Sequence, residues 1–233
     1  MPEELGRCDR QGYLERGSWK VMSEVFVRHL FMNNGKAEMI QKQIQEMLDH
    51  QSIIRTSDVV KNGIPKPYLN RMVKNGQLIK VARGIYITDW SQYDEYAIFQ
   101  LQHQKVIYSY LSALYFHGLI DVIPKYKGVT IYTGYSPHRF PKEVKRHFIQ
   151  KELYEIGVTK LQTSFGNEVR VYDLERTICD LIRERQKIDV EIFSTSLKRY
   201  IQSSDKNLRK LYQYARAFHV LENVQSLIEV LYL

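Results

Sequence analysis

The stretch from residue 51 to residue 88 constrains the fold more than any other part of the chain. It predicts a short helix carrying Val59 and Val60, a second helix that begins at Pro67, and two strands joined near Gly84. Proline suits the first turn of a helix because its missing N–H has no partner there. Glycine adopts the positive φ that a tight turn needs. Helix, turn, helix and hairpin in this order predict a winged helix-turn-helix.

Local signals define the ends of these elements. Thr56, Ser57 and Asp58 are N-cap candidates for the first helix, and Asn62-Gly63 and Asn75-Gly76 end the two helices. The second helix has one apolar face, and the strands are expected over residues 78–81 and 85–87. A helix before this stretch is expected from a stripe at i, i+4, i+7 and i+8, formed by Ile40, Ile44, Met47 and Leu48.

Charge indicates what this stretch contacts. Residues 51–88 contain seven basic side chains and one acid, Asp58, which gives +6, whereas the whole chain carries +8. Arginine and lysine on an outward helix face can pair with guanine in the major groove, and asparagine with adenine. The side chains predicted to contact DNA are Thr56, Ser57, Lys61, Lys66, Tyr68, Asn70, Arg71, Lys74, Lys80 and Arg83. A solvated basic face on a protein-binding winged helix is the alternative.

Length and composition limit the class of protein. A chain of 233 residues with 44% hydrophobic content is long enough for two folded domains. It has no run of 18 apolar residues, so no membrane span is expected, and its start lacks the apolar core of a secretory signal. Two distant cysteines, Cys8 and Cys179, build neither a disulfide framework nor a metal site, which favours the cytoplasm.

The predicted layout has three parts, and the fold class is α+β. Residues 1–33 are expected to be a poorly ordered or weakly folded extension, and residues 34–90 a winged helix-turn-helix DNA-binding domain. Residues 91–233 form a mixed α/β domain with a helical C-terminal end. Its expected elements include a helix from Ser91, a strand at residues 128–133, a hairpin turning at residues 165–167 and a helix capped by Asp173.

A second basic segment lies in this C-terminal part. Residues 135–148 read as a loop in which bases outnumber the single acid, Glu143. Such a loop can contact a second phosphate, face an acidic partner or be merely solvated, and the sequence leaves these alternatives open. The side chains of this possible second basic surface are Arg139, Lys142, Lys145 and Arg146.

Together these pieces resemble a known family. A winged segment ending in LIKVARGIYI, followed by YLSALYFHGLIDVIP and later VRVYDLERTICDLI, resembles the AbiEi antitoxin family over about residues 36–185. The segment 83–86 recurs in many winged proteins. The spacing of Ser112-Ala113-Leu114 and His117-Gly118-Leu119 before residues 173–177 is more specific.

The resemblance implies a function. AbiEi proteins are the regulatory halves of abortive-infection, type IV toxin–antitoxin systems, and their winged domain represses their own promoter. The expected partners are double-stranded operator DNA, typically repeats in that promoter, and a nucleotidyltransferase-like toxin opposed without a stable complex. Residues 91–233 would then be the antitoxin domain.

No catalytic residue, cofactor or metal is predicted. His117 before Gly118 reads as a histidine that hydrogen-bonds a carbonyl at a helix end, and Cys179 as a buried thiol. Asp173 and Arg176 read as an N-cap with a local ion pair. The alternative is a metal-dependent nucleic-acid enzyme that uses Asp173, Glu175 and Asp180, although no further ligand stands at a recognisable spacing.

Overall fold

The computed structural model describes residue 35 and residues 38–48, 52–135 and 140–232. Residues 38–48 are helical, and the further elements follow in order along the chain. They are β1 (Ile53–Arg55), α2 (Thr56–Lys61), α3 (Pro67–Lys74), β2 (Ile79–Ala82), β3 (Ile85–Ile87), η1 (Trp90–Gln92), α4 (Glu95–Gln102), β4 (Ile107–Tyr108), α5 (Tyr110–Phe116), β5 (Lys127–Tyr132), β6 (Val144–Ile149), α6 (Lys151–Tyr154), β7 (Val158–Gln162), β8 (Glu168–Tyr172), α7 (Leu174–Arg183), η2 (Arg185–Lys187), α8 (Val190–Gln202), α9 (Leu208–Ala217) and α10 (Leu221–Tyr232). The predicted extension at residues 1–33 lies outside the described residues.

The N-terminal part joins three helices to a small antiparallel sheet. Its strand order is β1-β3-β2, and the helix at residues 38–48, α2 and α3 pack on one apolar cluster with it. Ile44, Ile54, Val59 and Leu69 are buried there, so the expected stripe on the first helix and the apolar face of α3 are confirmed. Strand β1 was not predicted. It pairs with β3 in the register Ile54 to Tyr86.

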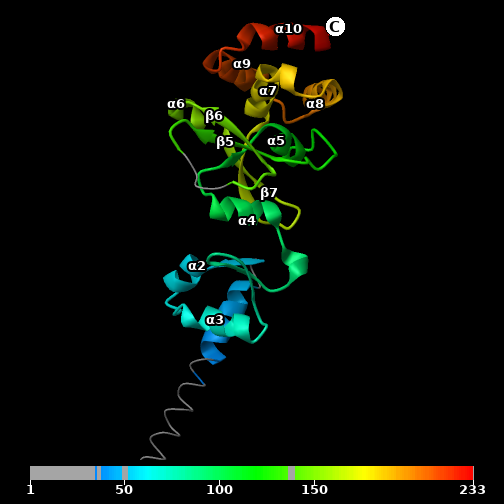
Figure 1. The fold of residues 1–233 in the computed structure, drawn as a ribbon. Helices are drawn as coiled ribbons and strands as arrows, with labels where there is room; N and C mark the ends of the chain where they lie inside the picture. Colours follow the sequence, from blue (N-terminus) through cyan, green and yellow to red (C-terminus); the bar gives the residue numbers. More distant parts are fainter. Residues whose placement is uncertain (1–34, 36–37, 49–51, 136–139, 233) are drawn as a thin grey trace, which may run out of the picture.

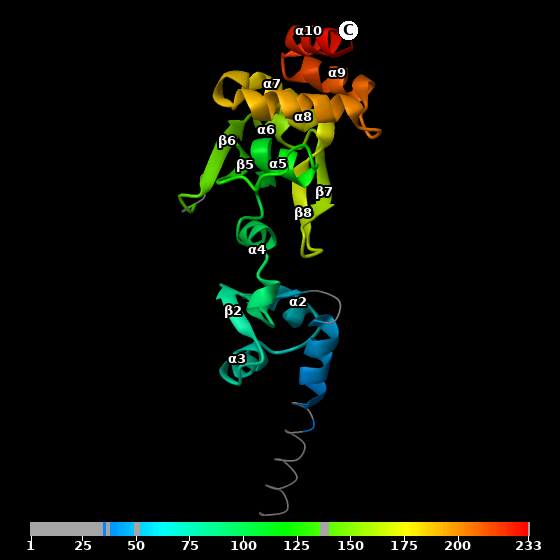
Figure 2. The same ribbon diagram turned by 90° about the vertical axis from the view of Figure 1, so that its right-hand side faces the viewer.

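The C-terminal part is built on a five-stranded mixed sheet in the order β6-β5-β4-β8-β7. Strand β5 runs parallel to β6 and antiparallel to β4, while β4 runs parallel to β8. Figure 2 shows α4 on the side of this sheet that faces the winged part, and α7 to α10 gathered at the far side. The predicted hairpin is the pair β7–β8, and the predicted cap of α7 is confirmed, because Asp173 accepts from the N–H of Arg176 at 2.9 Å.

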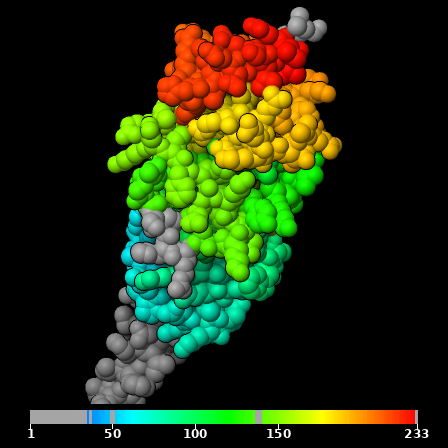
Figure 3. Space-filling view, turned by 45° about the horizontal axis from the view of Figure 1, so that its top comes forward, coloured from blue at the N-terminus to red at the C-terminus, as the bar shows by residue number. Residues whose placement is uncertain are grey.

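Two sheets and their helices form an elongated molecule, with α3 near one end and α10 at the other (Figure 1). Figure 3 shows the same order on the surface, from the cyan winged part to the orange and red helices α9 and α10. The expected mixed α/β architecture with a helical C-terminal end is therefore observed. The domain boundary expected near residue 90 stays a prediction. Apolar packing continues across this position, since Ile85 and Ile87 of β3 lie in one cluster with Tyr96 and Phe99 of α4.

A buried carboxylate connects α4 to the rest of the molecule. Asp94 is 1% exposed and caps α4 by accepting from the N–H groups of Tyr96 and Ala97. Its other oxygen accepts from the hydroxyl of Thr163 at 2.6 Å and from the side-chain amide of Asn167 at 2.8 Å. Asp94 is therefore the N-cap, and the sequence-based choice of Ser91 was wrong. Ser91 lies in η1, where Asp89 is the cap.

Candidate nucleic-acid interface

Helix α3 presents one apolar face to the core and one basic face to solvent. Pro67 stands in its first turn as predicted, and Leu69 and Met72 are 1% and 3% exposed. The spacing of these two residues turns the remaining side chains outward, because residues three apart share one face of a helix. The exposed polar side chains of this face are Lys66, Asn70, Arg71 and Lys74. The guanidinium of Arg71 lies 5.6 Å from the ring centre of the half-buried Tyr68.

The hairpin β2–β3 is held against the start of α2. Gly84 has φ of +73°, as its place in the turn predicted, and its carbonyl accepts from the N–H of Thr56 at 2.9 Å. A Cβ at Gly84 would lie 3.3 Å from the hydroxyl oxygen of Thr56, so the hairpin and α2 approach closely there. Arg83 at the tip and Lys80 on β2 are exposed. The first strand of the hairpin, β2, begins at Ile79, one residue later than predicted.

A groove brings half of the predicted contact residues together. The open groove of about 480 Å³ lies between α2, α3 and the hairpin, and polar groups line it from all three elements. The predicted residues among its lining are Thr56, Ser57, Lys66, Asn70 and Arg83. The other five, which are Lys61, Tyr68, Arg71, Lys74 and Lys80, lie outside its lining, and all but Tyr68 are exposed.

Two further polar residues line this groove and were not predicted. Arg55 donates to both carboxylate oxygens of Asp58, at 2.6 and 2.8 Å, so this pair places the one acid of the stretch beside a cation. Gln104 lies in the turn after α4, in a segment that the sequence placed in another domain. Only the i, i+3 spacing of Arg55 and Asp58 could have signalled the pair. Nothing local signals Gln104, because it reaches the groove through the tertiary fold.

The expected N-cap of α2 is wrong. The helix begins at Thr56 itself with Arg55 in the cap position, and no side chain caps its first turn. Asp58 stands within the first turn, where a carboxylate favours the positive end of the helix dipole, and is engaged by Arg55. The hydroxyls of Thr56 and Ser57 are therefore not used as caps. Ser57 is exposed and remains beside the groove.

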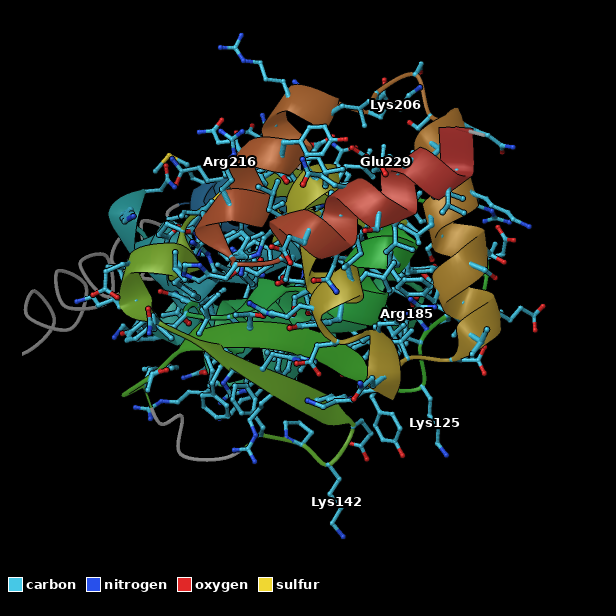
Figure 4. The ribbon with its side chains drawn as sticks, turned by 90° about the horizontal axis from the view of Figure 1, so that it is seen from above. Lys125, Lys142, Arg185, Lys206, Arg216 and Glu229 are labelled. Carbon is cyan, nitrogen blue, oxygen red and sulfur yellow. The ribbon has the colours of Figure 1, made fainter. Side chains whose placement is uncertain are left out.

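The second basic surface is not the loop that the sequence predicted. Residues 144–149 form the edge strand β6, so the adjacent residues Lys145 and Arg146 point to opposite faces of the sheet. Three consecutive polar residues, Lys145 to His147, interrupt the polar–apolar alternation that would have indicated a strand. Lys142 precedes the strand and points outward, on the same side of the molecule as Lys125 and Arg185 (Figure 4). Arg139 lies outside the described residues.

The residues considered for catalysis are occupied by structural contacts. His117 ends α5, and its Nε2 lies 2.8 Å from the carbonyl oxygen of Tyr172, while burial lowers its pKa. The partner is thus a carbonyl across the fold rather than one of the same helix. Cys179 is 1% exposed, and burial raises its pKa to about 12, which keeps the thiol protonated and unreactive.

The carboxylates near α7 are each held by polar groups. Asp173 caps the helix and accepts from Lys210 at 2.8 Å, and Glu175 accepts from the N–H of Asn207 at 2.9 Å. Arg176 pairs with Asp180 at 3.0 Å, so the expected ion pair with Asp173 is wrong. Among the described residues, no group of three or more histidine, cysteine, aspartate or glutamate side chains is placed to hold a metal ion.

One family of known proteins matches the winged part. Residues 42–88 match the family described as transcriptional regulator, AbiEi antitoxin. This segment is therefore similar to the AbiEi regulators. It contains α2, α3 and the hairpin, together with the basic side chains that line the groove. The resemblance seen in residues 36–185 is therefore confirmed for the winged part of the AbiEi-like chain. None of the curated proteins matches the chain. In the part of the chain that the structure describes, no helix combines the length and apolar character needed to cross a bilayer.

Proposed function

We propose that this protein is the antitoxin of a type IV toxin–antitoxin system, and that it binds and represses its own promoter through the winged part. The observation that carries the proposal is the basic groove on the segment that matches the AbiEi regulators. Helix α3 and its N-cap residue, Lys66, expose three cations and an asparagine beside a hairpin that exposes two more cations. These are the side chains that grip phosphates and read base edges.

The geometry supports a division of labour. Helix α3 enters the major groove, where Asn70 and Arg71 reach base edges and Lys66 and Lys74 contact the flanking backbone. Thr56 and Ser57 donate to a phosphate, and Arg83 at the adjacent hairpin tip contacts the backbone beside it. Because the N–H of Thr56 is hydrogen-bonded to the carbonyl of Gly84, the start of α2 and the hairpin tip stay side by side.

Fluorescence anisotropy with the labelled upstream region tests DNA binding. Contact with about five phosphates predicts that the logarithm of the affinity falls against the logarithm of the salt concentration with a slope of roughly −4 to −5. A scrambled duplex of the same length is the control for specificity. Absence of binding at about 0.15 M salt, or a slope near zero, would refute the proposal, and a tight protein complex without DNA affinity would favour the protein-docking alternative.

Two arginines separate base readout from backbone grip. Arg71→Ala is expected to weaken operator binding by about 1–3 kcal/mol and to relax specificity at one base position. Arg83→Ala is expected to weaken operator and scrambled duplex alike, since phosphate contacts carry no sequence information. Lys160→Ala is a matched control, because this exposed lysine is on β7 of the other sheet. Equal losses on both duplexes for Arg71→Ala would remove Arg71 from base readout.

For the antitoxin activity we assign residues 91–233, which oppose a nucleotidyltransferase-like toxin in the cytoplasm without a stable complex. Co-expression with the neighbouring toxin tests this assignment. Variants with Arg71→Ala should lose repression and retain protection, because the substituted side chain lies on the winged part. Loss of protection in the same variant, at equal protein level, would contradict the division of the two activities. A metal-dependent turnover abolished by Asp180→Asn would favour the enzyme alternative.

A further inference from the structure

A basic cleft lies between the edge strand β6 and the end of α7, on the C-terminal part of the molecule. Its volume is about 310 Å³, which is at the small end of ligand sites. Cations line it from three elements: Lys145 and Arg146 come from β6, Arg183 from α7 and Lys187 from η2. One acid, Glu184, faces these four cations, so the cleft has a strong positive excess.

The sheet register fixes which side chains of β6 enter the cleft from the helical side. Thr130 of β5 pairs with His147 of β6, and side chains of neighbouring strands in register share a face. Thr130 donates to the hydroxyl of Ser109, which directly precedes α5, so His147 and Lys145 project toward α5 and α7. The ring of Tyr110, the first residue of α5, stacks on His147 with ring centres 3.6 Å apart.

Arg183 is held in position before any ligand arrives. Its Nη2 lies 2.9 Å from Oδ1 of Asp180, which is 1% exposed, and donates to the hydroxyl of Tyr110 at 2.8 Å. Both contacts use the same nitrogen of a guanidinium that has five N–H donors. A planar fork fixed at one corner and open at the others suits the bidentate recognition of a phosphate.

Two features of the cleft cost stability. Tyr110 has a φ of +50°, a left-handed conformation that a bulky residue rarely adopts. The Nε2 atom of His147 is buried and has no hydrogen-bond partner in the described part of the chain. Strained backbone and unsatisfied polar groups gather at functional sites, where a ligand or its positioning accounts for them.

The free charge in the cleft comes mainly from β6. Lys187 is paired with Glu184 at 2.7 Å, so this cation is largely neutralised. Lys145 and Arg146 are exposed, and no carboxylate pairs with either of them among the residues that the structure describes. Only Lys145 of these two shares the face of His147, so an anion that enters the cleft meets the unpaired ammonium of Lys145 and, opposite it, the fixed guanidinium of Arg183.

We propose that this cleft binds a phosphate group, held by Lys145 on one side and by Arg183 on the other, over the stacked rings of Tyr110 and His147. A phosphate dianion matches the charge excess and offers oxygens to both sides. The group belongs either to a small phosphorylated ligand such as a nucleotide or to a nucleic-acid backbone. The site is separate from the groove on the winged part, and its occupation does not depend on operator binding.

Isothermal titration calorimetry on the full chain tests the site with three probes, which are inorganic phosphate, ATP and a single-stranded 12-nucleotide DNA. The wild type is expected to bind at least one of them with a Kd below about 1 mM at low salt. Lys145→Ala is expected to weaken that binding about tenfold, which is the loss of one charge-assisted hydrogen bond. Lys142→Ala is the matched control, since Lys142 is exposed and lies outside the lining of the cleft.

The probes also identify the source of the phosphate. Tighter binding of ATP than of the oligonucleotide assigns a small ligand, and the reverse assigns a nucleic-acid backbone, provided that Lys145→Ala weakens either one. Binding of none of the three, or an equal loss in Lys142→Ala, overturns the proposal. The ring nitrogen signals of His147 give a second readout by NMR, because they should shift on addition of the probe in the wild type, and in Lys145→Ala only at about tenfold higher probe concentration.

Operator affinity measured in parallel separates this proposal from the proposed function. Lys145→Ala is expected to leave operator binding unchanged, because Lys145 lies on the C-terminal sheet. A chain that binds ATP and no operator would refute promoter binding and leave the cleft intact. A chain that binds the operator and none of the three probes would refute the phosphate site in the cleft and leave promoter binding intact.

Discussion

Gly84 offers a sharp test of how the hairpin is joined to α2. Alanine at this position has to keep a φ of +73°, which costs an L-residue about 1–2 kcal/mol. The new methyl group would also lie 3.3 Å from Oγ1 of Thr56, closer than atoms usually pack. Relieving that contact moves Thr56 or the hairpin and adds about 1 kcal/mol, at the low end for overpacking. The expected loss of unfolding free energy for Gly84→Ala is therefore about 2–3 kcal/mol.

Gly76 is the matched control for this substitution. Its φ is +72°, and a Cβ added there meets nothing within 4 Å, so Gly76→Ala carries the backbone cost alone. Thr56→Ala removes the crowded hydroxyl, and in that background Gly84→Ala is expected to cost the same as Gly76→Ala. The cost of Gly84→Ala in the wild type minus its cost in the Thr56→Ala background is a coupling free energy of about 1 kcal/mol, which a double-mutant cycle measures.

Urea unfolding followed by far-UV circular dichroism provides the assay, with amide exchange of β3 as a local readout. Operator affinity is measured on the same variants, because a displaced hairpin tip moves Arg83 away from its phosphate. A cost for Gly84→Ala no greater than that for Gly76→Ala would refute the reasoning. So would a penalty that persists unchanged when Thr56 is alanine.

Three further predictions concern stability. Leu69→Ala should lower the free energy of unfolding in urea by about 2–5 kcal/mol, since Leu69 is 1% exposed. The control Lys74→Ala, at an exposed position, should change it by less than about 0.5 kcal/mol. Similar effects of the two substitutions would contradict the burial of Leu69. Asp94→Ala should lower the free energy of unfolding by about 3 kcal/mol, whereas Asp189→Ala, which removes the cap of α8, should lower it by about 1 kcal/mol. The difference is expected because Asp94, unlike Asp189, also accepts from the side chains of Thr163 and Asn167. Equal losses would show that these two hydrogen bonds add nothing to stability. Burial, with Lys145 as a smaller cause, lowers the pKa of His147 to about 4. The unfolded chain therefore binds the proton first, and stability falls as the pH drops from about 6.5 toward 4. This decrease should be about 1–2 kcal/mol larger in the wild type than in His147→Phe, and parallel pH curves for the two proteins would count against the prediction.

Sequence reasoning succeeded where the controlling interaction is local. The glycines at positions 63, 76 and 84 were expected at helix ends and in the hairpin turn, and all three have positive φ. The apolar spacing of Leu69 and Met72 predicted which face of α3 is buried, and the remaining polar residues follow from it. This local information was enough to predict the order of helices and strands in the winged part.

The failures involve partners that are distant in sequence or short elements. Strand β1 has only three residues and no apolar alternation of its own, so only its pairing with β3 defines it. Strand β6 was read as a loop because three consecutive polar residues interrupt its alternation. The cap of α4 was assigned to Ser91 because the contacts of Asp94 with Thr163 and Asn167 span some 70 residues of sequence. The groove likewise includes Gln104 only through the tertiary fold.

The surroundings of Arg176 determine how the C-terminal part can be dissected. Its guanidinium is fully buried, lies 4.2 Å from the ring centre of Tyr172 and 3.8 Å from that of Phe218, and donates to the carbonyls of Leu153 and Ile156. Phe218 directly follows α9, so deleting the last two helices would open one side of a buried cation to water and leave its packing incomplete. Truncated chains would then lose solubility before they reveal which residues oppose a toxin. Point substitutions on exposed positions of α9 and α10 are the better route to map that activity.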